Sequence, residues 1–229
     1  MKREELEKTK NGNFVDFSGH KNLLVSFGGI YQGLGIPVFE FFNSISDIQC
    51  DKIFLRDFNQ AWYHMGVDSE LNSMDEITEY LGKMITEKGY EKVCFIGNSM
   101  GGYAALLFGS ILKVSCVIAF APQTFINKGN RLFYLDRRWR KQIARVYAFN
   151  NKKTENFDIK KILSRNQDFG TRLNIYYSTQ HRLDKIHAER LKRINNIFLH
   201  PIREGGHEVV RIVRNNGELK SLIKASFEI

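Results

Sequence analysis

The sequence predicts an α/β fold, with a doubly wound, mostly parallel sheet and helices on both faces. Short runs rich in β-branched and aromatic residues alternate with longer amphipathic stretches along most of the chain. The short runs are continuously apolar, as in parallel strands that are buried on both faces. Strand, helix and strand in repeated order indicate βαβ units.

The predicted strands are six, and one helix between two of them has clear start and stop signals. The strands cover residues 23–27, 52–57, 92–97, 117–122, 174–179 and 196–202. The helix is predicted to begin at Ser73, which forms a capping-box pattern with Glu76, and to end near Gly89. Apolar residues at helical spacing lie between these two signals.

Length and composition favour a single domain over 1–229. The chain has 229 residues, of which 43% are hydrophobic, enough for one full core, and no linker is evident. The charged N-terminus lacks the apolar core of a signal peptide, so a cytoplasmic location is expected. Cys50, Cys94 and Cys116 form no CxxC pair and are expected to be buried free thiols.

One segment, 123–172, is longer than a crossover helix requires and carries the whole charge imbalance of the chain. It holds 13 of the 34 Lys and Arg residues but 4 of the 25 Asp and Glu residues, so the remainder has 21 of each. Aromatic residues are mixed with these basic ones. We therefore expect an inserted, basic cap or lid at 123–172.

The sequence Gly97-Asn98-Ser99-Met100-Gly101 follows one predicted strand and precedes a helix-like run. A serine on such a strand-turn-helix elbow is held in a strained, exposed turn. Gly97 and Gly101 fit this turn because side chains there would collide where strand and helix cross closely. The alternatives are a plain tight turn or a phosphate-binding loop, although the dinucleotide pattern GxGxxG is absent.

On this motif and its position among the strands, the chain resembles the α/β-hydrolase superfamily from Asn22 to the C-terminus. The resemblance implies that Ser99 is a nucleophile, and it implies a mechanism class but no substrate. It also implies the chain order serine, acid, histidine. His207, in a glycine-containing loop after the last predicted strand, is the expected general base.

Asp184 is the expected acid because it is the nearest carboxylate after the strand at 174–179. His181 stands about where many members of the superfamily carry this aspartate, so Asp168 and Glu204 remain as alternatives. A second alternative reads His181, Asp184 and His187 as metal ligands, but their spacing drifts around a helix. No metal and no cofactor are expected.

The backbone amides of Met100 and Gly29 are the expected oxyanion donors. Gly28 lies beside Gly29 and is a candidate for substrate contact. Trp62 and Tyr63 follow a predicted strand at the edge where ligands enter, so they line the pocket or belong to the core.

The resemblance places 123–172 where relatives carry a cap over the active site. Arg137, Arg138 and Trp139 are therefore candidates for substrate binding, since arginine pairs with phosphate or carboxylate and aromatic rings stack on sugars or adenine. An anionic partner is expected, such as an acidic glycan, a phosphorylated substrate or acyl-CoA as co-substrate. Nucleic-acid binding alone is disfavoured because no recognition motif is present. Peripheral membrane contact through the cap is an alternative.

The predicted function is hydrolysis of an ester or thioester through an acyl-enzyme on Ser99, with an anionic or carbohydrate-linked substrate. The first alternative is an O-acyltransferase, in which the hydroxyl of a glycan or polysaccharide replaces water. The second is a non-catalytic binding module on the same fold, which predicts an unreactive Ser99. The sequence leaves the oligomeric state open.

Overall fold

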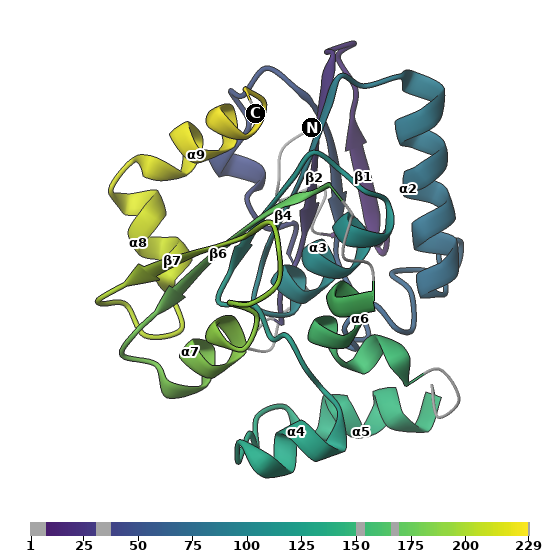
Figure 1. Ribbon diagram of the computed structural model, residues 1–229. Coiled ribbons are helices and arrows are strands. Elements are labelled where there is room, and N and C mark those ends of the chain that lie inside the picture. Colours follow the sequence, from purple (N-terminus) through teal and green to yellow (C-terminus); the bar gives the residue numbers. More distant parts are fainter. Residues whose placement is uncertain (1–7, 31–37, 150–153, 166–169, 229) are drawn as a thin grey trace.

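A computed structural model describes residues 8–30, 38–149, 154–165 and 170–228. Its seven-stranded sheet has the order β1-β3-β2-β4-β5-β6-β7, and every neighbouring pair is parallel except β1 and β3 (Figure 1). The strands are β1 (Asn13–Asp16), β2 (Asn22–Phe27), β3 (Asp51–Leu55), β4 (Lys92–Asn98), β5 (Cys116–Phe120), β6 (Arg172–Ser178) and β7 (Ile197–Ile202).

Helices cover both faces of this sheet, as predicted. On one face the core includes apolar residues of α2 (Met74–Lys88), α3 (Met100–Ile111), α6 (Ile159–Arg165) and α7 (Arg182–Glu189). On the other face, α8 (Val209–Asn215) and α9 (Glu218–Ser226) pack with the segment 39–50, which contains the short 3₁₀ turn η1 (Phe42–Ser44). No helix within the described chain is long and apolar enough to cross a bilayer.

Continuous apolar strands supply both cores, because successive side chains of a strand point to opposite faces. In β4, Val93 and Phe95 join the core beneath α2 and α3, while Cys94 and Ile96 join the core beneath α8 and α9. All five residues of β5 are buried. The three cysteines are free and buried, as expected.

The predicted strands and the predicted helix are all present, with shifts of a few residues at their ends. The Ser73 side chain accepts from the Glu76 amide, and the Glu76 carboxylate in turn accepts from the Asn72 amide. Gly89 closes the helix with a left-handed φ of 59°. β1 was not predicted from the sequence, because this short edge strand is half exposed and has no continuous apolar run.

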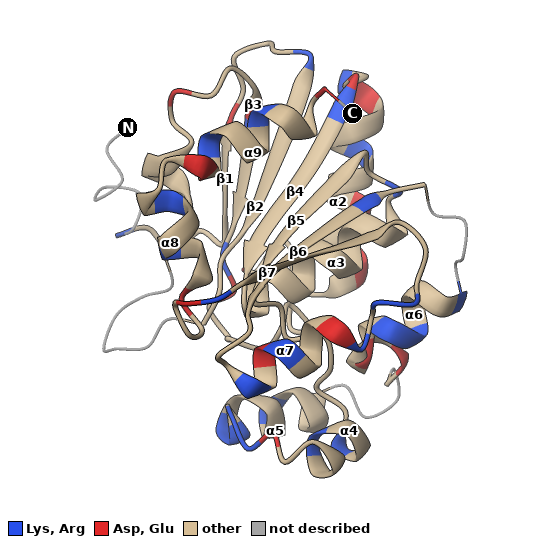
Figure 2. Cartoon of the chain, turned by 60° about the vertical axis from the view of Figure 1, so that its left-hand side comes forward, with Lys and Arg blue, Asp and Glu red and all other residues tan. Residues whose placement is uncertain are grey.

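Between β5 and β6 lie α4 (Lys128–Phe133), α5 (Arg140–Phe149), the 3₁₀ turn η2 (Glu155–Phe157) and α6. The chain leaves β5 at the carboxyl edge of the sheet, and α4 and α5 lie beyond this edge (Figure 1). Lysine and arginine are prominent on α4 and α5 (Figure 2). This basic segment therefore lies at the same end of the sheet as Ser99, which directly follows β4.

Candidate active site

Ser99 occupies a strained turn between β4 and α3. Its φ is 53° and its ψ is −111°, a backbone conformation that non-glycine residues rarely adopt and that clusters at functional sites. The Ser99 amide donates to the Phe120 carbonyl at 2.8 Å, which fixes the turn against β5. The hydroxyl is thereby presented at the carboxyl edge of the central strand.

The glycines on either side of Ser99 are required by close backbone approach, as predicted. A Cβ at Gly97 would lie 2.2 Å from the Gly101 carbonyl oxygen, and a Cβ at Gly101 would lie 2.1 Å from the Phe27 carbonyl oxygen. Real Cβ atoms do not approach backbone this closely, so any side chain would force strand and helix apart. The tight crossing of β4, β2 and α3 thus depends on these two positions.

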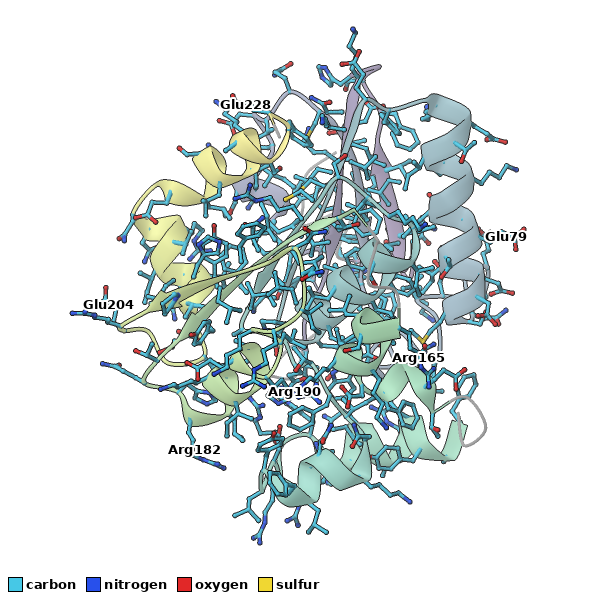
Figure 3. The ribbon with its side chains drawn as sticks, viewed as in Figure 1. Glu79, Arg165, Arg182, Arg190, Glu204 and Glu228 are labelled. Atoms are coloured by element: carbon cyan, nitrogen blue, oxygen red, sulfur yellow. The ribbon has the colours of Figure 1, made fainter. Side chains whose placement is uncertain are left out.

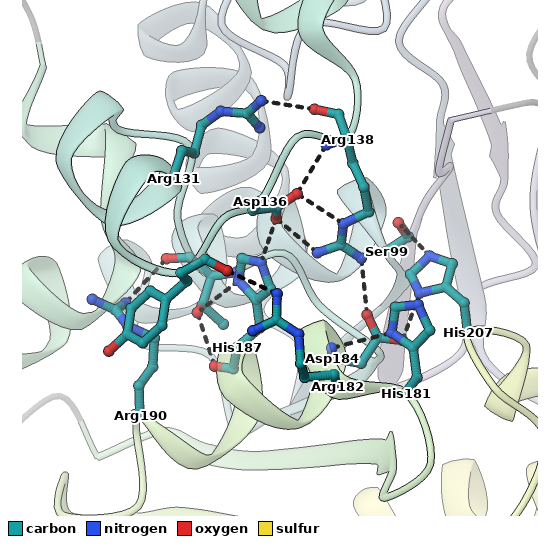
Figure 4. Close-up of polar contacts among 12 residues, drawn as sticks. Ser99, Arg131, Asp136, Arg138, His181, Arg182, Asp184, His187, Arg190 and His207 are labelled. Atoms are coloured by element: carbon teal, nitrogen blue, oxygen red, sulfur yellow. Dashed lines mark hydrogen bonds and ion pairs between the residues drawn. The ribbon is translucent and has the colours of Figure 1, made fainter.

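The structure brings Ser99, His207 and Asp184 together from three separate loops and helices (Figure 4). His207 Nε2 lies 3.0 Å from Ser99 Oγ, and His207 Nδ1 lies 2.6 Å from Asp184 Oδ2. Because a carboxylate only accepts, the Nδ1–H donates to Asp184 and Nε2 is left to accept the serine hydroxyl proton. This is the geometry that a serine nucleophile, a base and an orienting acid require.

Of the alternative acids, Glu204 is exposed and points away from the molecule at its outer edge (Figure 3). Asp168 lies outside the described residues. Asp184 is fully buried in the first turn of α7, three residues beyond His181. His181 is the N-cap of this helix, and its Nδ1 accepts from the Asp184 amide at 3.2 Å. The capping histidine therefore directs the Asp184 carboxylate toward His207.

Asp184 is held in its ionised form by its neighbours. Burial raises the pKa of this carboxyl group. The hydrogen bond from His207 and the charges of His207, His181 and Arg138 lower the pKa by more than burial raises it. The net result is a pKa below the ordinary value of 3.8. A charged acceptor is what a base needs in order to stabilise the imidazolium that forms when it takes a proton.

Arg138, from the turn before α5, joins Asp184 to a second buried carboxylate. Its Nη1 donates to Asp184 Oδ1 at 3.0 Å, while Nε and Nη2 donate to the two oxygens of Asp136 at 3.1 and 2.9 Å. Asp136 also accepts from His187 Nε2 at 3.0 Å, and the Thr124 amide donates to His187 Nδ1 at 2.9 Å. A buried polar network thus connects the basic segment with α7.

The three residues considered as metal ligands do not come together. His187 points into the network of Asp136 and Thr124, so it does not converge with His181 and Asp184. His207 takes its place, and ligand atoms of His181, Asp184 and His207 all lie within 4.8 Å of one another. However, the Arg138 guanidinium is already bonded to this carboxylate and would repel a cation. The donor set therefore suits an ionised acid beside a base better than a metal centre.

The amides expected to bind an oxyanion lie beside Ser99. Met100 begins α3, where the first amides have no partner within the helix and the helix dipole favours negative charge. Gly29 lies against the other side of the turn, since a Cβ there would be 3.0 Å from the Asn98 carbonyl oxygen. Neither amide has an acceptor among the described residues.

A pocket of about 740 Å³ opens in front of Ser99 and His207. Its volume is within the range of small-molecule sites, roughly 300 to 1,000 Å³. Its walls are formed by Ile30, by residues of the segment 38–44, by Trp139 and by residues of α8 and α9. Ser99 is only 5% exposed, so a ligand in the pocket would shield the serine hydroxyl from water.

Comparisons with known proteins agree with this architecture. No family model matches the chain, and no curated protein matches it in sequence. Solved structures do match: the capsule O-acetyltransferase of Neisseria meningitidis serogroup A has a TM-score of 0.71 at 16% identity, covering 93% of this chain and 90% of that one. FphF, a fluorophosphonate-binding serine hydrolase of Staphylococcus aureus, has a TM-score of 0.62 at 17% identity, covering 91% and 84%. The chain has the α/β-hydrolase fold.

A third solved structure that is similar to this chain is that of a protein complex. The glycosylation-associated Gap123 complex of Streptococcus agalactiae matches with a TM-score of 0.67 at 17% identity, covering 92% of this chain and 43% of that one. On the α/β-hydrolase fold, ligands bind outside the carboxyl ends of the parallel strands. The pocket at Ser99 lies at this edge.

Two residues expected at the pocket belong to the core instead. Trp62 and Tyr63 are both fully buried, and both have left-handed φ angles, of 53° and 63°. This tight turn is held by Asp57, whose carboxylate accepts from the Ala61 and Tyr63 amides at 2.6 and 2.9 Å, and it directs the two aromatic rings inward. The pocket-lining interpretation of Trp62 and Tyr63 is therefore wrong.

The other substrate-binding candidates are divided by the structure. Trp139 lines the pocket with Ser99 and His207, as expected. Gly28 is used internally, because its amide donates to Leu55 and its carbonyl accepts from the Tyr63 hydroxyl. Arg138 faces Asp184 and Asp136, while Arg137 lines a separate hollow on the outside of the basic segment.

The basic residues that do line the pocket were missed by the sequence analysis. Arg211 and Arg214 lie on α8, directly after His207, and both face the space in front of Ser99. Their separation of three residues places them on one face of a helix. This spacing, close to the expected base, was the signal that could have identified them.

Proposed function

We propose that this protein is a serine enzyme that cleaves an ester or thioester through an acyl-enzyme on Ser99. The observation that supports this is the continuous hydrogen-bond path from Ser99 Oγ to His207 at 3.0 Å and from His207 to Asp184 at 2.6 Å, at the floor of the pocket. An enzyme on this fold is also supported by the structural neighbours, which include serine hydrolases and an O-acetyltransferase.

The first half-reaction forms the acyl-enzyme. His207 Nε2 takes the hydroxyl proton while Ser99 Oγ attacks the acyl carbonyl carbon, and Asp184 stabilises the imidazolium. The amides of Met100 and Gly29 hold the oxygen that becomes negative. Each such donor contributes about 3 kcal/mol of transition-state stabilisation in related chemistry. The protonated His207 then gives its proton to the leaving alcohol or thiol.

The second half-reaction releases the acyl group. His207 takes a proton from water, the resulting hydroxide attacks the acyl carbon, and Ser99 Oγ leaves with a proton from His207. The products are a carboxylic acid and the free enzyme. A sugar hydroxyl in place of water would give a new ester by the same steps.

Transfer to a hydroxyl is the second candidate function. It is favoured by similarity over nearly the whole of both chains to the capsule O-acetyltransferase, a variant of which was solved in complex with CoA, at 14% identity and a TM-score of 0.63. In this chain, Arg211 and Arg214 would pair with phosphates of an acyl-CoA donor or with an acidic glycan. The Trp139 ring would stack on a sugar or on adenine.

The nucleophile is tested with a fluorophosphonate probe and intact-mass measurement. We expect one adduct on the wild type and none on Ser99→Ala, with slow or no labelling of His207→Ala. Hydrolysis of p-nitrophenyl acetate should fall by on the order of 10⁴-fold or more in both variants. Ser110→Ala is the matched control, because Ser110 is a buried serine of α3 outside the pocket. A folded wild type that takes no label would instead leave a binding module on this fold.

Hydrolysis and transfer are separated by following acetyl-CoA with and without acidic oligosaccharides. Free thiol released without an acceptor, with acetate as product, indicates a hydrolase. Release that depends on the oligosaccharide, with acetyl ester found on it, indicates an acyltransferase. In the second case Arg211→Gln and Arg214→Gln should raise KM for acetyl-CoA while leaving p-nitrophenyl acetate turnover within about threefold.

A further inference from the structure

The outer side of α4 and of the turn that follows it exposes large apolar side chains. Leu132 is 77% exposed, Phe133 is 78% exposed and Leu135 is 60% exposed. They lie within four residues of one another, and Leu132 and Leu135 share a shallow hollow with Arg131, Arg137 and Arg140. Single exposed apolar residues are ordinary on a protein surface, but a contiguous group of them with a polar rim marks an interaction surface.

The rim of this apolar group is strongly basic. Residues 123–149 contain seven Lys and Arg residues and one acidic residue, Asp136. Asp136 also lines this hollow, but it is buried and its carboxylate already pairs with Arg138 and His187, so the surface keeps an excess of positive charge. The remaining basic residues, Lys128, Arg131, Arg137, Arg140, Lys141 and Arg145, pair with no carboxylate of the described chain.

We propose that this surface, residues 128–141, docks on the surface of an anionic lipid bilayer. In this arrangement Leu132, Phe133 and Leu135 enter the boundary between head groups and acyl chains, while the surrounding lysines and arginines contact lipid phosphates. Apolar and aromatic anchors with a rim of basic residues are the combination that binds peripheral proteins to anionic membranes. The net positive charge of the surface provides the complementarity.

The same observations argue against the two other occupants. A symmetric contact between two copies would place two uncompensated sets of positive charges opposite one another, which like-charge repulsion disfavours. A nucleic acid would pair with the arginines through its phosphates, but it would not require three projecting leucine and phenylalanine side chains. A bilayer satisfies both the charge and the apolar surface.

Docking would bring the pocket near the membrane, because the chain segment that forms this surface also contributes to a wall of the pocket. Trp139, four residues after Leu135, lines the pocket together with Ser99. A substrate linked to lipid would thus meet the pocket at the bilayer surface. The docking itself does not require the proposed activity, and vesicle binding and Ser99 labelling measure the two separately.

The test is flotation of the full chain with vesicles of phosphatidylcholine alone or mixed with phosphatidylglycerol. We expect at least tenfold tighter binding to the mixed vesicles, weakened by added salt. Leu132→Ser/Phe133→Ser/Leu135→Ser should reduce this binding at least tenfold, as should Arg137→Glu/Arg140→Glu. Lys83→Glu/Lys192→Glu changes the net charge by the same amount elsewhere and should leave binding within about threefold.

Insertion of the apolar group is measured directly with Phe133→Trp. Its fluorescence should be quenched by brominated acyl chains in anionic vesicles and not by bromide in solution. Fluorophosphonate labelling of Ser99 in each surface variant reports whether the fold and the pocket are intact. If the wild type never labels, the proposed function fails, while vesicle binding still decides the docking.

Three outcomes would overturn the docking proposal. The first is no preference of the wild type for anionic vesicles. The second is vesicle binding that the triple serine variant leaves unchanged and that short RNA duplexes displace completely, which would assign the surface to phosphate backbones. The third is a dimer in solution that the triple serine variant abolishes, without vesicle binding, which would assign the surface to a second copy.

Discussion

Arg138 donates to Asp184, the carboxylate that also accepts from His207: Nη1 lies 3.0 Å from Asp184 Oδ1, and His207 Nδ1 lies 2.6 Å from Asp184 Oδ2. The arginine comes from the segment between β5 and β6, whereas Asp184 is on α7. The acid of the candidate site is thus shared between its base and a cation from the basic segment. We therefore predict that Arg138 is a positioning residue whose charge acts on His207 through Asp184.

Arg138→Met should move the acid limb of the kcat/KM profile to higher pH. Without the guanidinium, the Asp184 carboxylate interacts only with the two histidines and stabilises a protonated His207 more strongly. The limb then lies at higher pH, because a carboxylate that has lost its arginine favours the positively charged form of its neighbour more strongly. Arg138→Lys keeps the charge and should restore the limb. The measurement is ester hydrolysis from pH 5 to about pH 9.

Arg190→Met is the matched control for this prediction. Arg190 forms a two-pronged pair with Asp158, at 2.7 and 3.0 Å, which is also buried and also joins α7 to the segment between β5 and β6. Breaking a buried pair costs on the order of 3–5 kcal/mol, so both variants lower the free energy of unfolding. Only Arg138→Met should move the limb. An equal shift in both variants would show that lost packing, and not the charge on Asp184, is responsible.

Gly101→Ala should prevent the native crossing of β2, β4 and α3. Its methyl group would lie 2.1 Å from the Phe27 carbonyl oxygen, and backbone cannot move aside as a side-chain tip can. We expect a loss of more than about 3 kcal/mol in unfolding free energy together with loss of Ser99 labelling. Urea unfolding followed by circular dichroism provides the measurement.

The control substitution is Gly129→Ala, in α4. A Cβ at Gly129 would approach nothing closer than the Asn127 Oδ1 atom at 3.7 Å, and alanine favours helix over glycine by roughly 1 kcal/mol. Gly129→Ala should therefore be neutral or slightly stabilising. Full stability of Gly101→Ala would mean that α3 can slide away from β2, which would contradict the prediction.

His181 should be replaceable by asparagine but not by alanine. Its Nδ1 caps α7 by accepting from the Asp184 amide, and asparagine is a preferred N-cap residue. His181→Ala should cost about 1 kcal/mol of stability and lower kcat, because the first turn of α7 carries Asp184. His181→Asn should restore most of both. A lowered kcat in both variants at equal stability would show that the imidazole itself is required.

Much of the fold followed from local sequence signals, and the reasons are physical. Strands buried on both faces are continuously apolar, and the capped helix from Met74 to Lys88 carries its boundaries in Ser73 and Gly89. The edge strand Asn13–Asp16 has neither signal, because it is half exposed and its pairing with β3 is a long-range contact. Sequence patterns report burial and local capping, and this strand depends on neither.

The residues of the candidate site were predictable where their position after a strand determines their place in the fold. They were less predictable where the orientation of the side chain determines whether a residue faces the site. Ser99, Asp184 and His207 each follow a strand, so the fold brings them to one edge. Trp62 also follows a strand, but left-handed backbone angles held by Asp57 turn it inward. Arg138 could be recognised as basic and near the site, but its pairing with Asp184 is a contact between segments far apart in the sequence.

Stability should fall as the pH drops from about 6.5 toward 4, partly because of His187. The Thr124 amide donates to His187 Nδ1, so the ring carries its proton on Nε2, which donates to Asp136. A second proton, on Nδ1, would point at the Thr124 N–H group. Burial lowers the pKa of His187 from 6.5 to about 4, so between these values the unfolded chain binds a proton that the folded chain does not. The unfolded state gains up to roughly 3 kcal/mol once the pH is below 4.

His187→Asn removes this titrating group and should flatten the dependence of unfolding free energy on pH between 6.5 and 4, even though lost packing lowers stability at pH 7. The flattening is partial, since burial also lowers the pKa of His64, to about 3, and that histidine stays in place. Urea unfolding at several pH values in this range gives the slope. An unchanged slope in His187→Asn would mean that the folded protein accepts the proton on His187, which requires the Thr124 amide to move away.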